Sequence, residues 1–168
     1  MTAPRIKNAH EFYKRFIYLE ELQQLLEKHK LPVAGSIPSV NWELFGAILT
    51  GDEGKGGYGS DLKLHEIKSA KETGSFEYQY HLHTGKQKLV EDMKVDHLFI
   101  SYSPDYQNVD VRIISGDKLK QKFESWLPGL IANYKGAKRK QRYRRSISLG
   151  FVKKHGTMVM QIKKGELV

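Results

Sequence analysis

The segment DHLFISYS, residues 96–103, constrains the fold more than any other part of the chain. It is short and largely apolar, as is typical of a strand at the centre of a sheet. Further strands are predicted at 61–70, 75–84 and 108–115. Together with the helical segments described next, they predict an α/β (α+β) fold in which a twisted mixed sheet is flanked by helices.

The N-terminal helix is predicted from residue 9 to 31 and is expected to end before Pro32. Its apolar side chains recur at spacings of three and four and form a broad surface for a small protein. This surface either belongs to the core or contacts a second subunit, and the sequence leaves both open. The side chains concerned are Phe12, Tyr13, Phe16, Ile17, Leu19, Leu22, Leu25 and Leu26.

Two further helices and a pair of C-terminal strands complete the expected fold. One helix is predicted from about Ser39 to Gly51, and a later one is expected to be interrupted at Pro128. The tail is predicted to form two strands that turn near Gly156. Because no repeat or linker divides the sequence, we expect a single domain over residues 1–168.

The charge of the chain indicates which class of partner it binds. Its formal net charge is +9 over 168 residues, and its isoelectric point is about 9.6. Such a basic protein usually meets a polyanion, and nucleic acid is the commonest one, although excess charge can also serve solubility alone. The absence of cysteine excludes disulfides and thiolate zinc sites.

Signals for export, membranes or nucleotides are not found. The segment MTAPRIKNAHEFYKRF is charged throughout, unlike a secretory signal, and no apolar run approaches the ~20 residues of a membrane helix. We therefore expect a cytoplasmic protein without membrane contacts. The glycine-rich segment GDEGKGGYGS lacks the phosphate-loop pattern, because Gly56 follows Lys55, so no small-molecule cofactor is expected.

Charged residues within the predicted strand 61–70 point to chemistry. Glu66 and Lys68 are two residues apart and project from one face, whereas Ile67 faces the other side. Asp61 joins them only if the chain bends, which the preceding glycines favour. Two converging carboxylates favour a hard cation such as Mg²⁺, beside which a lysine can orient a water molecule. In a basic protein this predicts phosphodiester hydrolysis; the alternative is an edge strand whose charges form surface pairs.

Asp61, Glu66, Ile67 and Lys68 after a glycine-rich turn resemble the core motif of the PD-(D/E)XK nucleases, and more closely that of the PvuII-like type II restriction endonucleases. In that group a Glu-x-Lys-Ser segment leads to a histidine cluster, as HEIKSAKETGSFEYQYHLHTG does here. The tail SISLGFVKKHGTMV is similar to the closing strands of the group. Two features depart from the pattern: Ser60 stands where the family name has proline, and only four residues separate the two acids.

The resemblance implies a restriction-endonuclease-like core and a role for each site residue. Asp61 and Glu66 would hold Mg²⁺, with the Ile67 carbonyl as an extra ligand and Glu43 as a supporting helix carboxylate. Lys68 would position the attacking water. The substrate would be double-stranded DNA, cut to leave 5′-phosphates, and the enzyme would be a prokaryotic homodimer joined through its N-terminal helix.

DNA contacts are expected in two regions. After the site, Tyr80, His81 and His83 would reach base edges, and Arg144 or Arg145 lies near the second base-reading position of the group. The histidines could instead ligate zinc with a third partner such as His65 or His97, or be exposed without a role. The basic run at 135–145 would contact phosphates or form an ordinary solvated surface. Its further members include Lys138, Lys140 and Arg142.

Three functions thus remain open. The favoured one is a Mg²⁺-dependent type II restriction endonuclease. The second is a PD-(D/E)XK nuclease of repair or junction resolution, which reads the shape of DNA. The third is a non-catalytic basic module for DNA or RNA, whose acids only pair with lysines.

Overall fold

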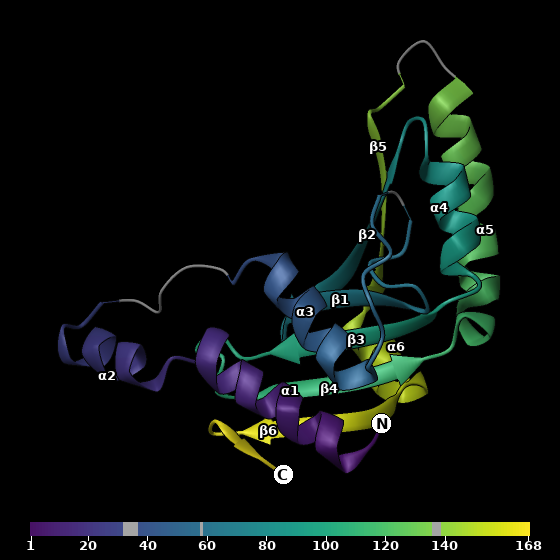
Figure 1. The fold of residues 1–168 in the computed structure, drawn as a ribbon. Helices are drawn as coiled ribbons and strands as arrows, with labels where there is room; N and C mark the ends of the chain where they lie inside the picture. Colours follow the sequence, from purple (N-terminus) through teal and green to yellow (C-terminus); the bar gives the residue numbers. More distant parts are fainter. Residues whose placement is uncertain (32–36, 58, 136–138) are drawn as a thin grey trace.

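The computed structural model describes residues 1–31, 37–57, 59–135 and 139–168 (Figure 1). Its main sheet has five strands in the order β1-β3-β4-β6-β7, of which β1 and β3 are parallel and the other neighbours antiparallel. The predicted mixed sheet flanked by helices is therefore confirmed as an α+β arrangement. The strands are β1 (His65–Lys71), β3 (Asp96–Tyr102), β4 (Val109–Ile114), β6 (Thr157–Lys163) and β7 (Glu166–Leu167).

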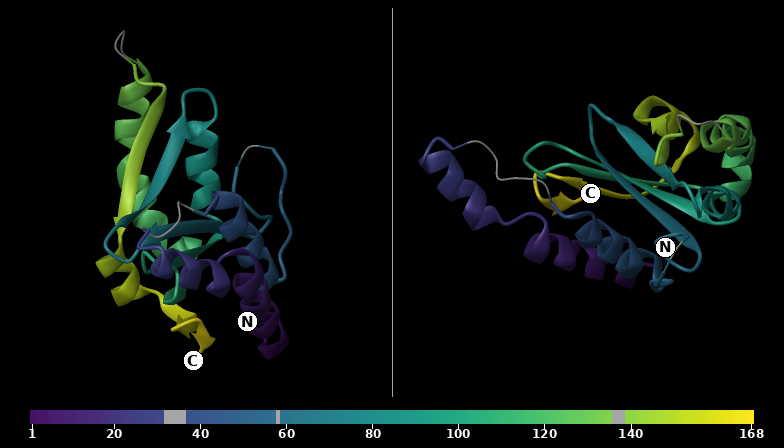
Figure 2. Two further views of the ribbon diagram at one scale, coloured as in Figure 1. Left: turned by 90° about the vertical axis from the view of Figure 1, so that its left-hand side faces the viewer. Right: turned by 90° about the horizontal axis from the view of Figure 1, so that it is seen from above.

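A second, two-stranded antiparallel sheet rises away from the main one (Figures 1 and 2). It pairs β2 (Ser75–His81) with β5 (Arg142–Ser148), and we call it the β2–β5 ribbon. Its apolar face packs against α4 (Gly85–Asp92) and α5 (Gly116–Lys135). The buried side chains of this face are Phe76, Tyr78, Tyr80, Tyr143 and Ile147.

Helices cover both faces of the main sheet because its strands alternate two sets of apolar residues. On β3, Leu98 and Ile100 face α1 (Ala3–Phe16) and α3 (Ser39–Thr50), while Phe99 lies in the second cluster with α5 and the ribbon. The central strand is buried on both sides, as its apolar sequence predicts. α3 ends at Gly51, where the sequence predicts its end, with the left-handed φ of 69° that glycine tolerates.

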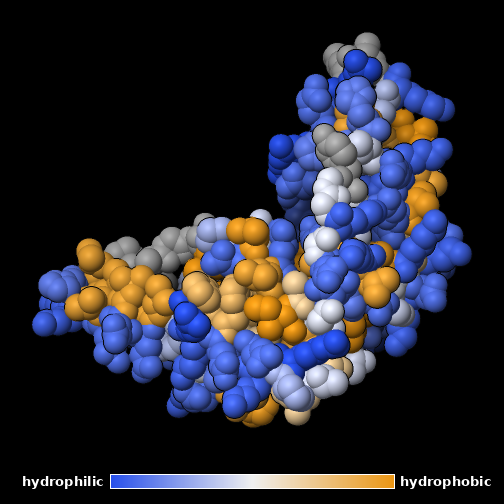
Figure 3. Space-filling view, viewed as in Figure 1, coloured by the Kyte–Doolittle hydropathy of each residue, from blue (hydrophilic) through white to orange (hydrophobic). Residues whose placement is uncertain are grey.

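The N-terminal helix predicted at 9–31 is two helices, α1 and α2 (Glu20–Lys28). They separate because Ile17 and Tyr18 both donate their backbone N–H to the Tyr13 carbonyl and bury their side chains in the core. Pro32, the expected end, lies outside the described residues. α2 projects from the body of the protein, and apolar side chains there stay exposed (Figures 1 and 3).

Two other expectations are wrong. α5 continues through Pro128, because Phe123, Trp126 and Leu130 extend one buried stripe across it. The tail contains α6 (Leu149–His155) between two strands, begun by Ser148, whose hydroxyl accepts from the backbone N–H of Phe151. α4 is not among the predicted helices.

Candidate active site

The chain bends between Ser60 and His65, so that Asp61 turns back onto β1. Ser60, which is buried, donates its hydroxyl to the Leu62 carbonyl at 2.6 Å. The backbone N–H of Asp61 donates to Glu66 Oε2 at 3.0 Å, and the N–H of Ile67 donates to Asp61 Oδ2 at 2.9 Å. The bend that the glycines predict is therefore present, and four intervening residues are enough to bring the two acids together.

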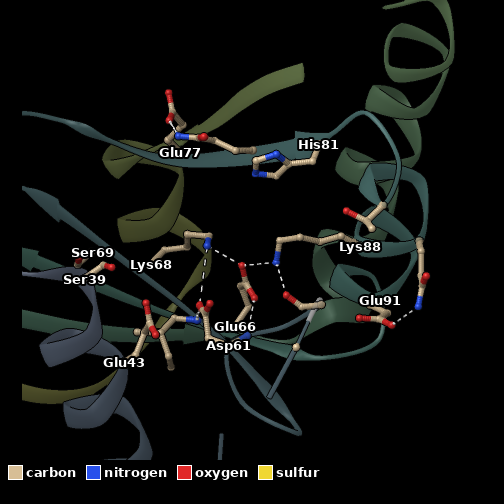
Figure 4. Close-up of a pocket in the computed structure, with 16 residues that line it drawn as sticks. Ser39, Glu43, Asp61, Glu66, Lys68, Ser69, Glu77, His81, Lys88 and Glu91 are labelled. Carbon is tan, nitrogen blue, oxygen red and sulfur yellow. Dashed lines mark hydrogen bonds and ion pairs between the residues drawn. The ribbon is translucent and has the colours of Figure 1, made fainter. Parts of the chain in front are cut away.

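Lys68 completes the group on the same face of β1. Its Nζ lies 2.5 Å from Glu66 Oε1 and 3.9 Å from Asp61 Oδ2 (Figure 4). The side chain of Ile67 points to the opposite face, into the core that α1 and α3 cover. Within that core, α3 approaches β1 closely: a Cβ at Gly46 would lie 2.6 Å from Cδ1 of Ile67. The period-two prediction for Glu66, Ile67 and Lys68 is confirmed.

A second lysine, which the sequence analysis missed, also reaches the site. Lys88 on α4 places its Nζ 2.8 Å from Glu66 Oε1 and 2.8 Å from the carbonyl oxygen of Gly59. Glu66, which is fully buried, therefore binds two ammonium groups through one oxygen. This pairing satisfies the condition under which a carboxylate can be buried in a protein.

Burial and the neighbouring charges shift the pKa values of the two acids in opposite directions. Burial raises the pKa of Glu66, but Lys68 and Lys88 outweigh it and lower that pKa to about 2. Burial raises the pKa of Asp61 to about 6, against the opposing effect of Lys68. The pKa of Lys68 is raised despite burial, because Glu66 and Asp61 stabilise its charged form.

A hydrogen-bonded layer lies beneath these residues. The Tyr78 ring lies under Lys68, 5.2 Å from its Nζ. Burial lowers the pKa of His97 to about 4, so its ring is neutral. His97 Nε2 donates to the Asp92 carbonyl at 2.7 Å, which leaves Nδ1 to accept from the Tyr78 hydroxyl at 2.9 Å. Both ring nitrogens of His97 are occupied, so it is not a metal ligand.

The site opens into a cleft between β1, α3, α4 and the β2–β5 ribbon (Figure 4). Glu43 lines this cleft from α3, which places the predicted helix carboxylate near Asp61. The opposite wall comes from β2, where Glu77, Gln79 and His81 face the cleft. Polar side chains from separate parts of the chain therefore surround the two acids.

The outward face of the ribbon continues this polar wall onto β5. His81 pairs across the strands with Arg142, and Gln79 with Arg144, so these side chains share a face. Arg142 donates to Gln79 Oε1 at 3.1 Å. His81, Arg142 and Arg144 are predicted contacts, but Gln79 is not among the predicted ones. Its alternation with the buried Tyr78 and Tyr80 could have indicated it.

Several expected DNA contacts need correction. Tyr80 is fully buried and donates its hydroxyl to Asp92 Oδ2 at 2.9 Å, so its side chain cannot reach a base. Arg145 lies on the opposite face of β5 from Arg144, over the Tyr143 ring. β2 ends at His81, so His83, exposed in the following turn, does not continue its face.

The other predicted contacts of the basic run do not line the cleft where the structure describes them. Lys140 is exposed near the start of β5. Lys138 lies outside the described residues. His65 is paired with an acid instead: its Nδ1 lies 2.9 Å from Asp52 Oδ2. No group of three or more histidine or acidic residues suited to a metal is found in the described parts of the chain.

The free oxygen atoms of the cleft fit Mg²⁺. Among the described residues, no side chain or backbone group donates to Asp61 Oδ1, and Glu66 Oε2 accepts only the N–H of Asp61. Both are carboxylate oxygens, the ligands that Mg²⁺ prefers, and Mg²⁺ commonly uses one or two carboxylates with waters and substrate phosphate. The Ile67 carbonyl remains the predicted extra ligand.

The sequence of the chain matches no known protein-family model, and no curated protein is significantly similar to it. Within the described residues, no helix combines the length and the apolar character needed to cross a membrane.

Proposed function

We propose that this protein is a Mg²⁺-dependent endonuclease that cuts double-stranded DNA at specific sites, of the type II restriction kind. The observation that carries the proposal is the convergence of Asp61, Glu66 and Lys68 at the base of an open cleft in a protein of net charge +9. Two acids with free oxygens and a lysine on the same face are what metal-assisted phosphodiester hydrolysis requires.

Asp61 Oδ1 and Glu66 Oε2 would hold the ion, with the Ile67 carbonyl as a further ligand. When bound, Mg²⁺ would supply positive charge to the scissile phosphate and favour the ionised form of a bound water. The Lys68 ammonium, fixed against Glu66, would donate a hydrogen bond to the attacking water and orient it. As the water oxygen bonds to phosphorus, the bond from phosphorus to the 3′-oxygen breaks. The water gives up a proton to solvent, the 3′-oxygen takes one up, and a 5′-phosphate and a 3′-hydroxyl remain.

The β2–β5 ribbon would read the DNA sequence. A two-stranded antiparallel ribbon fits the major groove, where base edges carry a distinct pattern of donors and acceptors. The outward face of the ribbon offers Gln79, which pairs well with adenine, and Arg144, which pairs well with guanine. These side chains favour site-specific cleavage over a repair nuclease that reads the shape of DNA.

A homodimer would supply one site for each strand. Each Asp61–Glu66–Lys68 set acts on one phosphate, and symmetric DNA offers its two phosphates about a two-fold axis. The exposed apolar side chains near α2, which include Phe16, Leu19, Leu22 and Leu25, would form the contact between the two copies. Sedimentation should then find a dimer at micromolar concentration, which the double variant Phe16→Glu, Leu22→Glu converts to a folded monomer.

Incubation with plasmid DNA and Mg²⁺ tests the function. Discrete fragments, absent with EDTA or with Glu66→Gln, support a restriction enzyme. Cleavage that depends on junctions or flaps supports the repair alternative. DNA that is bound but stays intact supports the non-catalytic module, in which the ion pairs of Glu66 serve stability alone.

A further inference from the structure

Lys88 has no part in the mechanism proposed above, although it reaches the centre of the site. Its Nζ contacts Glu66 Oε1 and the Gly59 carbonyl, each at 2.8 Å, and lies 3.5 Å from Asp92 Oδ1. Its side chain is 19% exposed, against 17% for Lys68. A lysine held by three oxygens from separate segments is fixed in place, unlike a solvated surface lysine.

Lys68 and Lys88 approach Glu66 from opposite sides (Figure 4). Both donate to the same oxygen, Oε1, at 2.5 Å and 2.8 Å. A carboxylate oxygen has two lone pairs, so two ammonium donors occupy Oε1 fully. Of the four carboxylate oxygens of Glu66 and Asp61, Glu66 Oε2 and Asp61 Oδ1 therefore remain for a metal ion.

Lys88 also joins the parts of the chain that carry the two acids. The Gly59 carbonyl, to which it donates, lies two residues before Asp61, directly before the bend. One ammonium group therefore fixes both the carboxylate of Glu66 and the segment that positions Asp61. It also faces Asp92, whose second oxygen is bonded to Tyr80.

We propose that Lys88 is a built-in second cation of the catalytic site, so that each chain binds a single divalent ion. The proposal rests on the nuclease function above. With Lys88 in place, three carboxyl groups (Asp61, Glu66 and Asp92) face two ammonium groups. Without it they face Lys68 alone, and Glu66 Oε1 gains a free lone pair beside Asp92, where a second ion can bind. Lys88 is thus a positioning residue, which acts through Glu66 and the Gly59 bend.

Calorimetric titration of the full chain with Ca²⁺, in the presence of a duplex that contains its cleavage site, tests the proposal. We expect about one Ca²⁺ per chain for the wild type and about two for Lys88→Met, which keeps the length of the side chain without its charge. Lys55→Met is the matched control. Lys55 Nζ lies 2.9 Å from Glu91 Oε2 and links the same bend to the same helix without touching Glu66. This control should bind about one Ca²⁺ per chain.

A wild-type protein that binds two ions per chain overturns the proposal, and so does a cooperatively melting Lys88→Met variant that still binds one. If Lys88→Met does not melt cooperatively, the wild-type stoichiometry alone decides. A wild-type protein that binds no Ca²⁺ and cuts no DNA with Mg²⁺ refutes the nuclease function itself. That failure is distinct from a cleaving enzyme with two ions per chain.

Discussion

Replacing Lys68 with methionine separates catalysis from binding and stability. The variant keeps the apolar stem that packs over the Tyr78 ring, 5.2 Å from the lysine Nζ, and removes only the ammonium group. Without a donor to orient the water, we expect cleavage to fall by about 10³-fold or more, with little change in DNA affinity. Plasmid cleavage with Mg²⁺ measures the first quantity, and fluorescence anisotropy of a labelled duplex with Ca²⁺ measures the second.

The cost in stability follows from the ion pairs that the variant loses. The attraction between Lys68 and Asp61, 3.9 Å apart, is worth about 4 kcal/mol at an effective dielectric constant of ~20, before desolvation is subtracted. Breaking a buried pair usually costs about 3–5 kcal/mol. Because Lys88 remains bound to Glu66, we expect the free energy of unfolding to fall by only about 2–3 kcal/mol.

Lys71→Met, at the exposed end of the same strand, is the control and should change neither cleavage nor stability appreciably. Near-normal turnover of Lys68→Met would remove Lys68 from the mechanism. A loss of DNA binding as large as the loss of cleavage would show instead that Lys68 acts in recognition.

Three other perturbations test separate parts of the structure. Burial and the nearby Glu66 raise the pKa of Asp92 to about 7. Between pH ~4 and ~7 the folded chain therefore binds more protons than the unfolded chain, so the free energy of unfolding falls as the pH rises through this window. Asp92→Asn should flatten that fall, by up to about 4 kcal/mol, in urea titrations at several pH values. Gly59→Ala should lower the melting temperature and cleavage together, because Gly59 has a φ of +127°, which residues with a Cβ rarely adopt. Gly54→Ala meets no atom within 4 Å and should be neutral. Arg142→Gln on the cleft-facing side of the ribbon should reduce the slope of log affinity against log salt by about 0.9, and Arg145→Gln on the other side should leave it unchanged.

Local sequence patterns predict much of this fold and, within the site, the convergence of Asp61, Glu66 and Lys68. The apolar run at 96–103 predicts a central strand, because a strand that is buried on both faces carries few polar residues. β3 occupies this run and is buried on both faces. Period two places Glu66 and Lys68 together, and the glycines before Asp61 predict the bend. These features depend on neighbours a few residues apart, which a sequence displays directly.

Some corrections follow from the same pattern, applied consistently. Tyr80 shares its parity with Phe76 and Tyr78, so one rule assigns all three to the buried face of β2. Arg145 likewise shares its parity with Tyr143 and Ile147, the buried residues of β5. The α1–α2 break is different. Tertiary burial of Ile17 and Tyr18 decides it, and an uninterrupted helical period gives no sign of it.

The contribution of Lys88 to the site cannot be predicted from local sequence patterns. Asp61, Glu66 and Lys68, the motif predicted from sequence, are negative overall, and burying Glu66 completely requires further positive charge. Mg²⁺ is the predicted source of that charge, although the chain has 28 lysines and arginines of its own. Lys88, which provides this charge, lies 22 residues from Glu66 in the sequence. It is on the eight-residue helix α4, which begins with glycine and has no side-chain N-cap. So short a helix has little stability alone and depends on packing against the ribbon and α5. The contact between Lys88 and Glu66 thus depends on the assembly of the ribbon, α4 and β1. For this reason, charge balance can predict that Glu66 needs a second cation, but it cannot identify the residue that provides it.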